Sequence, residues 1–304
     1  MFNLYFAGSR QKCGEQHLID NKCPRLFSQA NERRWILDYG KLDPNIKPKL
    51  FVDSGAFSVA HSGKTVDVDD YIRFINDTND FTDAYAQLDS IPFPNLNAKT
   101  ARECSELSWK NYLYMVDRIP SPEKLLPLYH FGEPKENLKR ILNTPIDALG
   151  GKPPSYIGIG GRHGVKTDEQ INYFDDIFKI IRDSDNPDVK VHAFGVTVLR
   201  ILEQFPFFSA DSTSYLKYAI YGIIITKYGG VAVSSRRLHS SKNLFSYHEK
   251  AKQAIIDIIN QSPYTLEELS TDTNARIKFN IDFYKNWADN YTYKGATVHK
   301  KRLF

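Results

Sequence analysis

Residues that can perform acid–base or nucleophilic chemistry follow five short apolar segments of this sequence. Asp53 follows Leu-Phe-Val, Asp89 follows Tyr-Ala-Gln-Leu, and Asp211 follows Phe-Phe-Ser-Ala. His130 ends a fourth segment, and a Gly-Gly-Arg run at 160–162 ends a fifth. Carboxylates that lie close together raise the pKa of at least one of them, and such clusters serve acid–base or nucleophilic catalysis. We therefore expect the three aspartates to share one site.

The chemistry that suits three carboxylates is displacement at the anomeric carbon of a nucleoside. One carboxylate would attack C1′ and form a glycosyl-enzyme ester, a second would move protons on the departing and arriving bases, and a third would read the edge of the base. The logic parallels a retaining glycosidase, with a heterocycle instead of water as the final acceptor. For each aspartate alone the alternative is structural, because an aspartate at the end of a strand often caps the next helix or a turn.

Short apolar segments alternate with segments of helical periodicity over most of the chain. The candidate strands are 2–7, 49–53, 84–89, 126–130, 156–160, 190–194, 207–211 and 230–234. The clearest helical segments are 32–39, 69–76, 99–118, 135–142, 168–181 and 214–225. This alternation predicts parallel strands, and about eight units predict an α/β fold of the closed (β/α)8 TIM-barrel type, with an open doubly wound sheet as the main alternative. In a barrel the carboxyl ends of all strands face one mouth, which would bring the aspartates together.

The pattern changes near Tyr247, after which only helical segments follow, at 248–260 and 274–290. The sequence then ends in a basic stretch at 299–302. We expect residues 1–245 to form the barrel and residues 246–304 to form a C-terminal helical extension packed on it.

The composition is that of a globular protein, with 41% apolar and 25% charged residues. The net charge of +4 permits a polyanionic partner without requiring one. The three cysteines form no Cys-x-x-Cys pair, which favours a reducing compartment. The N-terminal segment lacks a basic region and is typical of a strand rather than a signal peptide, and the apolar run around 218–226 is too short to span a bilayer. We expect a cytoplasmic protein without a membrane partner.

Five motifs in sequence order resemble the tRNA-guanine transglycosylases. The segment 51–58, Phe-Val-Asp-Ser-Gly-Ala-Phe-Ser, is similar to the Asp-Ser-Gly-Gly-aromatic-Gln signature of that family, and Asp89, the Gly-Gly turn and Asp211 follow in the same order. The stretches 192–197 and 208–214 are more similar to the phage DNA-guanine transglycosylases, which replace guanine in DNA with a 7-deazaguanine such as preQ0. The resemblance covers roughly residues 1–235 and implies a pentosyltransferase of phage DNA modification and restriction evasion, working in the host cytoplasm.

Carried over residue by residue, the resemblance implies that Asp211 is the nucleophile and Asp53 the general acid/base. Asp89 would accept hydrogen bonds from the N1/N2 edge of guanine. The rest of the base pocket would be formed by Ser54, Gly55, Phe57, His130, Gly160, Gly161 and Phe194. Phe57 and Phe194 would stack on the base, although for each residue taken alone a place in the barrel core is the better interpretation. The candidate contacts to the nucleic acid are Arg162, Arg236 and Arg237.

Two departures from the family bear on the substrate. His130 stands where the family usually has glutamine; it can still donate a hydrogen bond to the base, and a buried structural histidine is the alternative. The tRNA enzymes also carry a Cys-x-Cys-x-x-Cys…His zinc site after the barrel, and this sequence has no cysteine beyond Cys104. We therefore expect no metal and no cofactor, and DNA rather than tRNA as the substrate, together with the free 7-deazaguanine base. Reaching C1′ in a duplex requires extrusion of the base, by flipping or by local melting.

Other functions stay open from the sequence. The same chemistry could act on tRNA, or the chain could be a catalytically silent, nucleic-acid-binding partner subunit of the family, as a homodimer or beside another protein. A glycoside hydrolase is a further alternative, but the sequence has only three tryptophans and none follows a predicted strand. The glycines at 158–164 lack the register and the preceding unit of a dinucleotide-binding loop.

Overall fold

A parallel β-sheet forms the centre of the computed structural model, which describes residues 2–8, 12–56, 65–91, 100–161, 164–234 and 243–295. The strands are β1 (Asn3–Ala7), β2 (Arg25–Ser28), β3 (Leu50–Asp53), β4 (Ala84–Ala86), β5 (Leu125–Leu126), β6 (Leu128–Tyr129), β7 (Tyr156–Gly160), β8 (Lys190–Phe194) and β9 (Ser209–Ser212). Their order in the sheet is β5-β4-β3-β2-β1-β9-β8-β7-β6, and every pairing is parallel.

The two edges of this sheet are consecutive parts of one segment. Only Pro127 separates β5 from β6, and proline has no N–H to donate to a neighbouring strand. The N–H of Gln87 donates to the carbonyl of Leu126 at 3.0 Å, and the N–H of Gly158 donates to the carbonyl of Pro127 at 2.9 Å. The segment therefore joins both edges, and the sheet forms a nearly closed barrel. The predicted TIM-like fold is confirmed.

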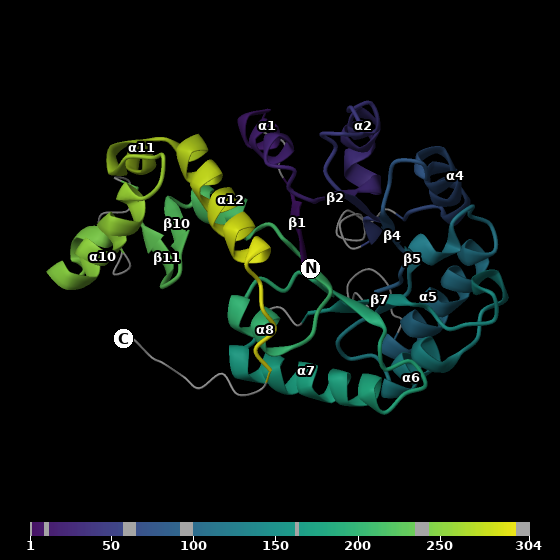
Figure 1. Cartoon of the computed structure of the whole chain (residues 1–304). Helices are drawn as coiled ribbons and strands as arrows, with labels where there is room; N and C mark the ends of the chain where they lie inside the picture. The colour runs from purple at the N-terminus through teal and green to yellow at the C-terminus, as the bar shows by residue number, and fades with distance from the viewer. Residues whose placement is uncertain are drawn as a thin grey trace.

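A helix follows each strand of the barrel except β5, which leads directly into β6. These helices are α1 (Lys12–Asp20), α2 (Gln29–Gly40), α4 (Val68–Thr78), α5 (Ala101–Val116), α6 (Lys135–Asn143), α7 (Thr167–Arg182), α8 (Leu199–Gln204) and α9 (Ser214–Ile220), and two short 3₁₀ turns lie at Pro122–Lys124 and Asp147–Leu149. Figure 1 shows α4 to α8 arranged around the outside of the strands. Successive strand residues point to opposite faces, so each strand presents alternate residues to the helices and to the interior.

The barrel interior is a packed aromatic core beneath the mouth. Phe51 contacts Tyr5 and Phe194 through ring centroids 5.5 and 5.6 Å apart, and all three belong to an inner cluster. The alternate residues Leu4 and Val52 belong to the larger cluster that packs under the helices. The interior is thus filled, and functional groups can gather only at the carboxyl ends of the strands.

Segment 25–28 supplies a barrel strand that the sequence pattern did not predict, while the predicted strand at 230–234 lies outside the barrel. Arg25 starts β2 with its side chain fully buried, and it donates to both carboxylate oxygens of Glu15 at 2.8 and 2.9 Å. Glu15 also accepts a hydrogen bond from Tyr39. The Arg25 guanidinium can lie in the core because Glu15 supplies its counter-charge and its acceptors. In the sequence, however, a charged residue at this position interrupts the apolar pattern from which strands are predicted.

The predicted helix at 214–225 is wrong in its second half. Helix α9 ends at Ile220, and Gly222 takes a φ of +75°, a left-handed conformation typical of helix ends. The β-branched residues that follow form β10 (Ile223–Thr226), which pairs antiparallel with β11 (Gly229–Ala232).

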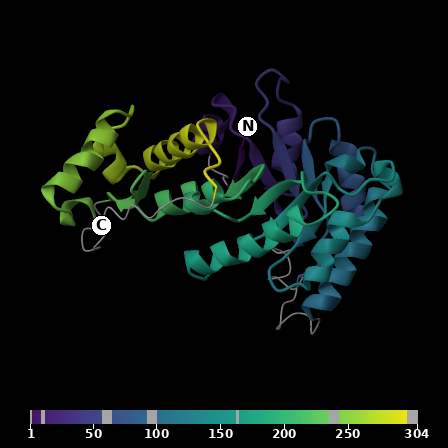
Figure 2. The ribbon, with the colours of Figure 1, turned by 60° about the horizontal axis from the view of Figure 1, so that its bottom comes forward.

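This hairpin belongs to a small lobe with the C-terminal helices. Its apolar cluster includes Ile224, Leu244, Ile255 and Phe279. The remaining elements of the lobe are a 3₁₀ turn at Leu244–Ser246 and the helices α10 (Glu249–Asn260), α11 (Leu266–Thr271) and α12 (Thr273–Asp289). Figures 1 and 2 both show β10, β11, α10 and α11 to one side of the barrel, with α12 running from them to the N-terminal strand. Within residues 248–295 the regular elements after Tyr247 are all helices, as predicted.

Helix α12 ties the lobe to the barrel. Asn280 accepts a hydrogen bond from the N–H of Ile225 at 2.7 Å and donates to the carbonyl of Tyr215 at 3.0 Å. At the other end of the helix, Trp287 packs edge-on against Phe2. Among the described residues, no helix combines the length and apolar character needed to cross a bilayer.

Candidate active site

Asp53 is the last residue of β3, and the turn after it is built around Gly55. The N–H of Gly55 donates to Oδ2 of Asp53 at 3.0 Å. Gly55 has a φ of +80°, and a Cβ added there would lie 2.4 Å from Oγ of Ser28. Only glycine therefore lets this turn close against β2 and hold the Asp53 carboxylate at the mouth.

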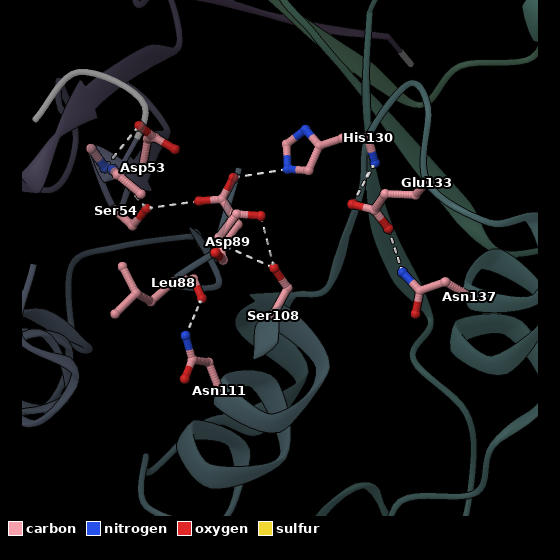
Figure 3. Close-up of polar contacts among 12 residues, drawn as sticks. Asp53, Ser54, Leu88, Asp89, Ser108, Asn111, His130, Glu133 and Asn137 are labelled. Atoms are coloured by element: carbon pink, nitrogen blue, oxygen red, sulfur yellow. Dashed lines mark hydrogen bonds and ion pairs between the residues drawn. The ribbon is translucent and has the colours of Figure 1, made fainter. Parts of the chain in front are cut away.

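Asp89 lies next to Asp53 and contacts a histidine from the following strand segment. Nε2 of His130 is 2.8 Å from Oδ2 of Asp89, and Oγ of Ser54 is 3.4 Å from its Oδ1 (Figure 3). The Asp89 side chain is only 6% exposed and that of His130 is 21% exposed. The mouth therefore carries a shielded carboxylate–imidazole pair beside Asp53.

Groups behind this pair fix its position. The N–H of His130 donates to Oε1 of Glu133 at 3.2 Å, and Glu133 in turn accepts a hydrogen bond from Asn137 on α6. On the other side, Asn111 of α5 donates to the carbonyl of Leu88 at 2.9 Å, directly before Asp89 (Figure 3). Both partners of the pair are thus held by helices packed outside the barrel.

Asp211 lies on β9 with its side chain 13% exposed. Its Oδ1 accepts a hydrogen bond from the N–H of Gly195 at 2.8 Å. The same oxygen lies 3.4 Å from Nε2 of His192, whose side chain is fully buried. Asp211 is therefore no helix cap. His192 of β8 and Gly195, directly after β8, contact its carboxylate, and a small part of the side chain is exposed to solvent.

The three carboxylates interact electrostatically. Burial, followed by the negative charges of Asp89 and Asp211, raises the pKa of Asp53 from 3.8 to about 7. The Gly55 hydrogen bond and the charge of His130 act in the opposite direction. Asp53 thus titrates near neutral pH, where a group can both give and take a proton.

The imidazole of His130 is the counter-charge of this cluster. Burial lowers its pKa, but the hydrogen bond and charge of Asp89 outweigh burial and raise the pKa above 6.5. Burial also raises the pKa of Glu133, although His130 and Asn137 oppose this shift. The raised pKa favours the protonated form of His130, which lies between the carboxyl groups of Asp89 and Glu133.

Gly160 and Gly161 were expected to line the base pocket, and in the structure both contact neighbouring residues of the site. A Cβ at Gly160 would lie 2.7 Å from Nδ1 of His130, so this glycine makes room for the imidazole. The N–H of Gly161 donates to the carbonyl of Phe194 at 3.1 Å and is therefore not available to a base in this structure. The ring of Phe194 is half-buried and lies on top of the interior aromatic core, 4.3 Å from the His192 ring.

Four predicted residues lie outside the described residues. These are the proposed stacking residue Phe57 and the proposed nucleic-acid contacts Arg162, Arg236 and Arg237. Within the described residues, no group of three or more histidine, cysteine or acidic side chains is arranged to hold a metal ion.

Sequence reasoning missed the groups that support the site, chiefly His192 and Ser209. Oγ of Ser209 lies 2.7 Å from Nδ1 of His192 and 2.6 Å from the hydroxyl of Tyr156. A usable signal was the two-residue spacing of Ser209 and Asp211, which places both on the inner face of one strand.

No protein-family model matches the chain, and no curated protein matches it.

Proposed function

We propose that this protein is a DNA-guanine transglycosylase, which exchanges guanine in DNA for a 7-deazaguanine base through a covalent intermediate on Asp211. The observation that carries the proposal is the convergence of Asp53, Asp89 and Asp211 at one barrel mouth, where burial and the charges of the other two aspartates together raise the pKa of Asp53 to about 7. A nucleophile, a proton carrier and a fixed acceptor for a base edge are the three groups that base exchange requires.

The proposed reaction has two displacements at C1′. In the first, a carboxylate oxygen of Asp211 bonds to C1′ while the C1′–N9 bond of guanine breaks, and protonated Asp53 gives its proton to the leaving base. In the second, the Asp53 carboxylate takes the N9 proton of the incoming base, whose N9 then bonds to C1′ as the ester bond to Asp211 breaks. Asp53 gives up a proton in the first step and regains one in the second. Because C1′ undergoes two displacements, its configuration is retained.

Recognition of the base is assigned to Asp89 and His130. An ionised Asp89 has only acceptor oxygens, which suits the N1–H and N2–H donors of guanine and of a 7-deazaguanine. The His130 contact occupies one of these oxygens at 2.8 Å and orients the other. A pyrimidine or adenine, with a different donor pattern on this edge, would leave buried groups unpaired.

DNA is preferred to tRNA because the sequence lacks the cysteines of the zinc site that the tRNA enzymes carry after the barrel. In its place stands the lobe of β10, β11 and α10 to α12. We also propose that the protein acts in the cytoplasm, on an extruded base.

The test is incorporation of labelled guanine or preQ0 into single-stranded DNA, duplex DNA and tRNA. We expect incorporation into DNA, and loss of at least about a thousandfold in rate for Asp211→Asn. The matched control is Asp38→Asn, which alters an exposed carboxylate paired with Lys41 on α2. Denaturing gels without incoming base should show a DNA adduct on the wild-type protein and none on Asp211→Asn.

Incorporation into tRNA alone would replace the proposed substrate by RNA. Neither exchange nor adduct with any nucleic acid, in a folded protein that still binds DNA, would identify a silent binding subunit. Normal exchange by Asp211→Asn would disprove the assigned nucleophile.

A further inference from the structure

A chain of buried polar groups reaches Asp211 from inside the barrel. It starts at the Tyr156 hydroxyl on β7, passes through Oγ of Ser209 at 2.6 Å and Nδ1 of His192 at 2.7 Å, and ends where Nε2 of His192 lies 3.4 Å from Oδ1 of Asp211. Ser209 and His192 are fully buried. The two contacts of Ser209 are hydrogen bonds, whereas Nε2 of His192 is buried and makes no hydrogen bond of normal geometry within the described residues. A buried polar atom of this kind requires a partner, and Oδ1 of Asp211 lies 3.4 Å from it.

The proton positions in the chain follow from the acceptor at its end. A carboxylate only accepts, so Nε2 of His192 must carry the proton that faces Asp211. Burial lowers the pKa of His192, so the ring is neutral and its Nδ1 is a bare acceptor. Ser209 then donates to Nδ1 and accepts from Tyr156, whose pKa is raised by burial and which keeps its proton. The opposite tautomer would set a bare nitrogen against the carboxylate.

Both contacts of the Asp211 carboxylate within the described residues fall on the same oxygen. Oδ1 accepts from the N–H of Gly195 at 2.8 Å and faces the N–H of His192 at 3.4 Å. The distance to His192 is long for a hydrogen bond, but contacts of this kind tighten when substrate binds. Oδ2 is left as the oxygen that can reach a substrate.

We propose that neutral His192, with its tautomer fixed by Ser209 and Tyr156, is a positioning residue that holds Oδ1 of Asp211 and makes Oδ2 the attacking oxygen. The inference rests on the proposed function for its role in the reaction. When Oδ2 bonds to C1′, Oδ1 becomes the ester carbonyl. When the ester breaks, the electron pair returns to the carboxylate, and the two N–H donors stabilise it as a leaving group. Loss of the His192 donor therefore slows breakdown of the adduct.

Three variants at position 192 separate positioning from packing. His192→Gln keeps an amide N–H near the place of Nε2, His192→Asn keeps one near Nδ1, and His192→Leu keeps only volume. We expect kcat to fall about 10- to 100-fold for the Asn and Leu variants, with KM changed less than about twofold, and to recover to within about fivefold for the Gln variant. The covalent adduct should accumulate in the Asn and Leu variants.

A purely structural histidine predicts another pattern. Gln and Asn would then lower activity in proportion to lost thermal stability, and the adduct would not accumulate. That result would overturn the proposal. Ser209→Ala and Tyr156→Phe should show the same kcat effect in smaller measure, because they weaken control of the tautomer without removing the donor.

A second measurement does not depend on activity. The ¹⁵N chemical shifts of the His192 ring in the wild-type protein report the tautomer, and we expect the neutral Nε2–H form at pH 7.5, because burial lowers the pKa of this ring below 6.5. Asp211→Asn should shift the Nε2 resonance, whereas Asp38→Asn should not. A charged ring or the Nδ1–H form would overturn the proposal. Failure of base exchange with the expected tautomer present would instead refute the proposed function and leave the positioning contact standing.

Discussion

Replacing Asp53 with asparagine should stabilise the protein at neutral pH while abolishing its activity. The carboxyl group has a pKa of about 7 in the folded protein and 3.8 as its ordinary value. Between these two values the unfolded chain binds fewer protons than the folded one, so the free energy of unfolding falls as pH rises from 4 to 7. At 1.36 kcal/mol per pH unit, this loss is at most about 4 kcal/mol.

Asparagine does not titrate, so the variant escapes this loss. Its amide oxygen can still accept the hydrogen bond from Gly55. We expect the wild type and Asp53→Asn to have similar free energies of unfolding at pH 4, and the variant to exceed the wild type by up to about 4 kcal/mol at pH 8. The assay is urea unfolding of both proteins at half-unit steps of pH, with Asp38→Asn as the surface control.

A difference between the two proteins that stays constant from pH 4 to pH 8 would refute the reasoning, because it would mean that Asp53 ionises at its ordinary pKa. The pH profile of kcat/KM provides a second reading. The wild type should show a limb near pH 7 that reports the free Asp53 carboxyl.

Three further changes test other parts of the structure. His130→Ala removes a charge that lowers the pKa of Asp53, so the limb in the kcat/KM profile should move to higher pH; an unmoved limb would contradict the assigned contact. Gly160→Ala adds a Cβ 2.7 Å from the His130 imidazole and should raise KM for the base more than about tenfold with little change in melting temperature, whereas an unchanged KM would show that the ring moves freely. Glu15→Gln leaves the buried Arg25 without its counter-charge and should cost about 3 to 5 kcal/mol in urea unfolding; a loss below about 1 kcal/mol would show that water reaches the guanidinium.

The fold class could be read from the sequence because most barrel strands are short apolar segments followed by helices. Strand β2 was not predicted because it begins with Arg25, a charged residue that is compatible with the core only through its ion pair with Glu15. The segment 230–234 took its place in the prediction, since its apolar pattern is equally strand-like. The two segments differ in their partner strands. The segment at 230–234 pairs antiparallel with β10, and the sequence pattern had assigned most of β10 to the predicted helix at 214–225.

The main site residues were predictable because strand ends in a barrel share one mouth. Asp53, Asp89 and His130 lie together there, and Asp211 is close enough to shift the pKa of Asp53. The support beneath Asp211 was not predictable in the same way. It depends on the register of β8 and β9, which pairs His192 with Ser209, and register is a property of the assembled sheet.

The packing of α12 has a consequence for the order in which the chain acquires its structure during synthesis. Strand β1 leaves the ribosome before α12, yet Phe2, directly before this strand, is covered by Trp287 of α12. His17 of α1 likewise meets Asp282 at 2.6 Å. Contacts that span nearly the whole sequence form slowly, because the loop they close is long. A nascent chain that lacks α12 therefore exposes the apolar surface around Phe2 that this helix covers in the folded protein.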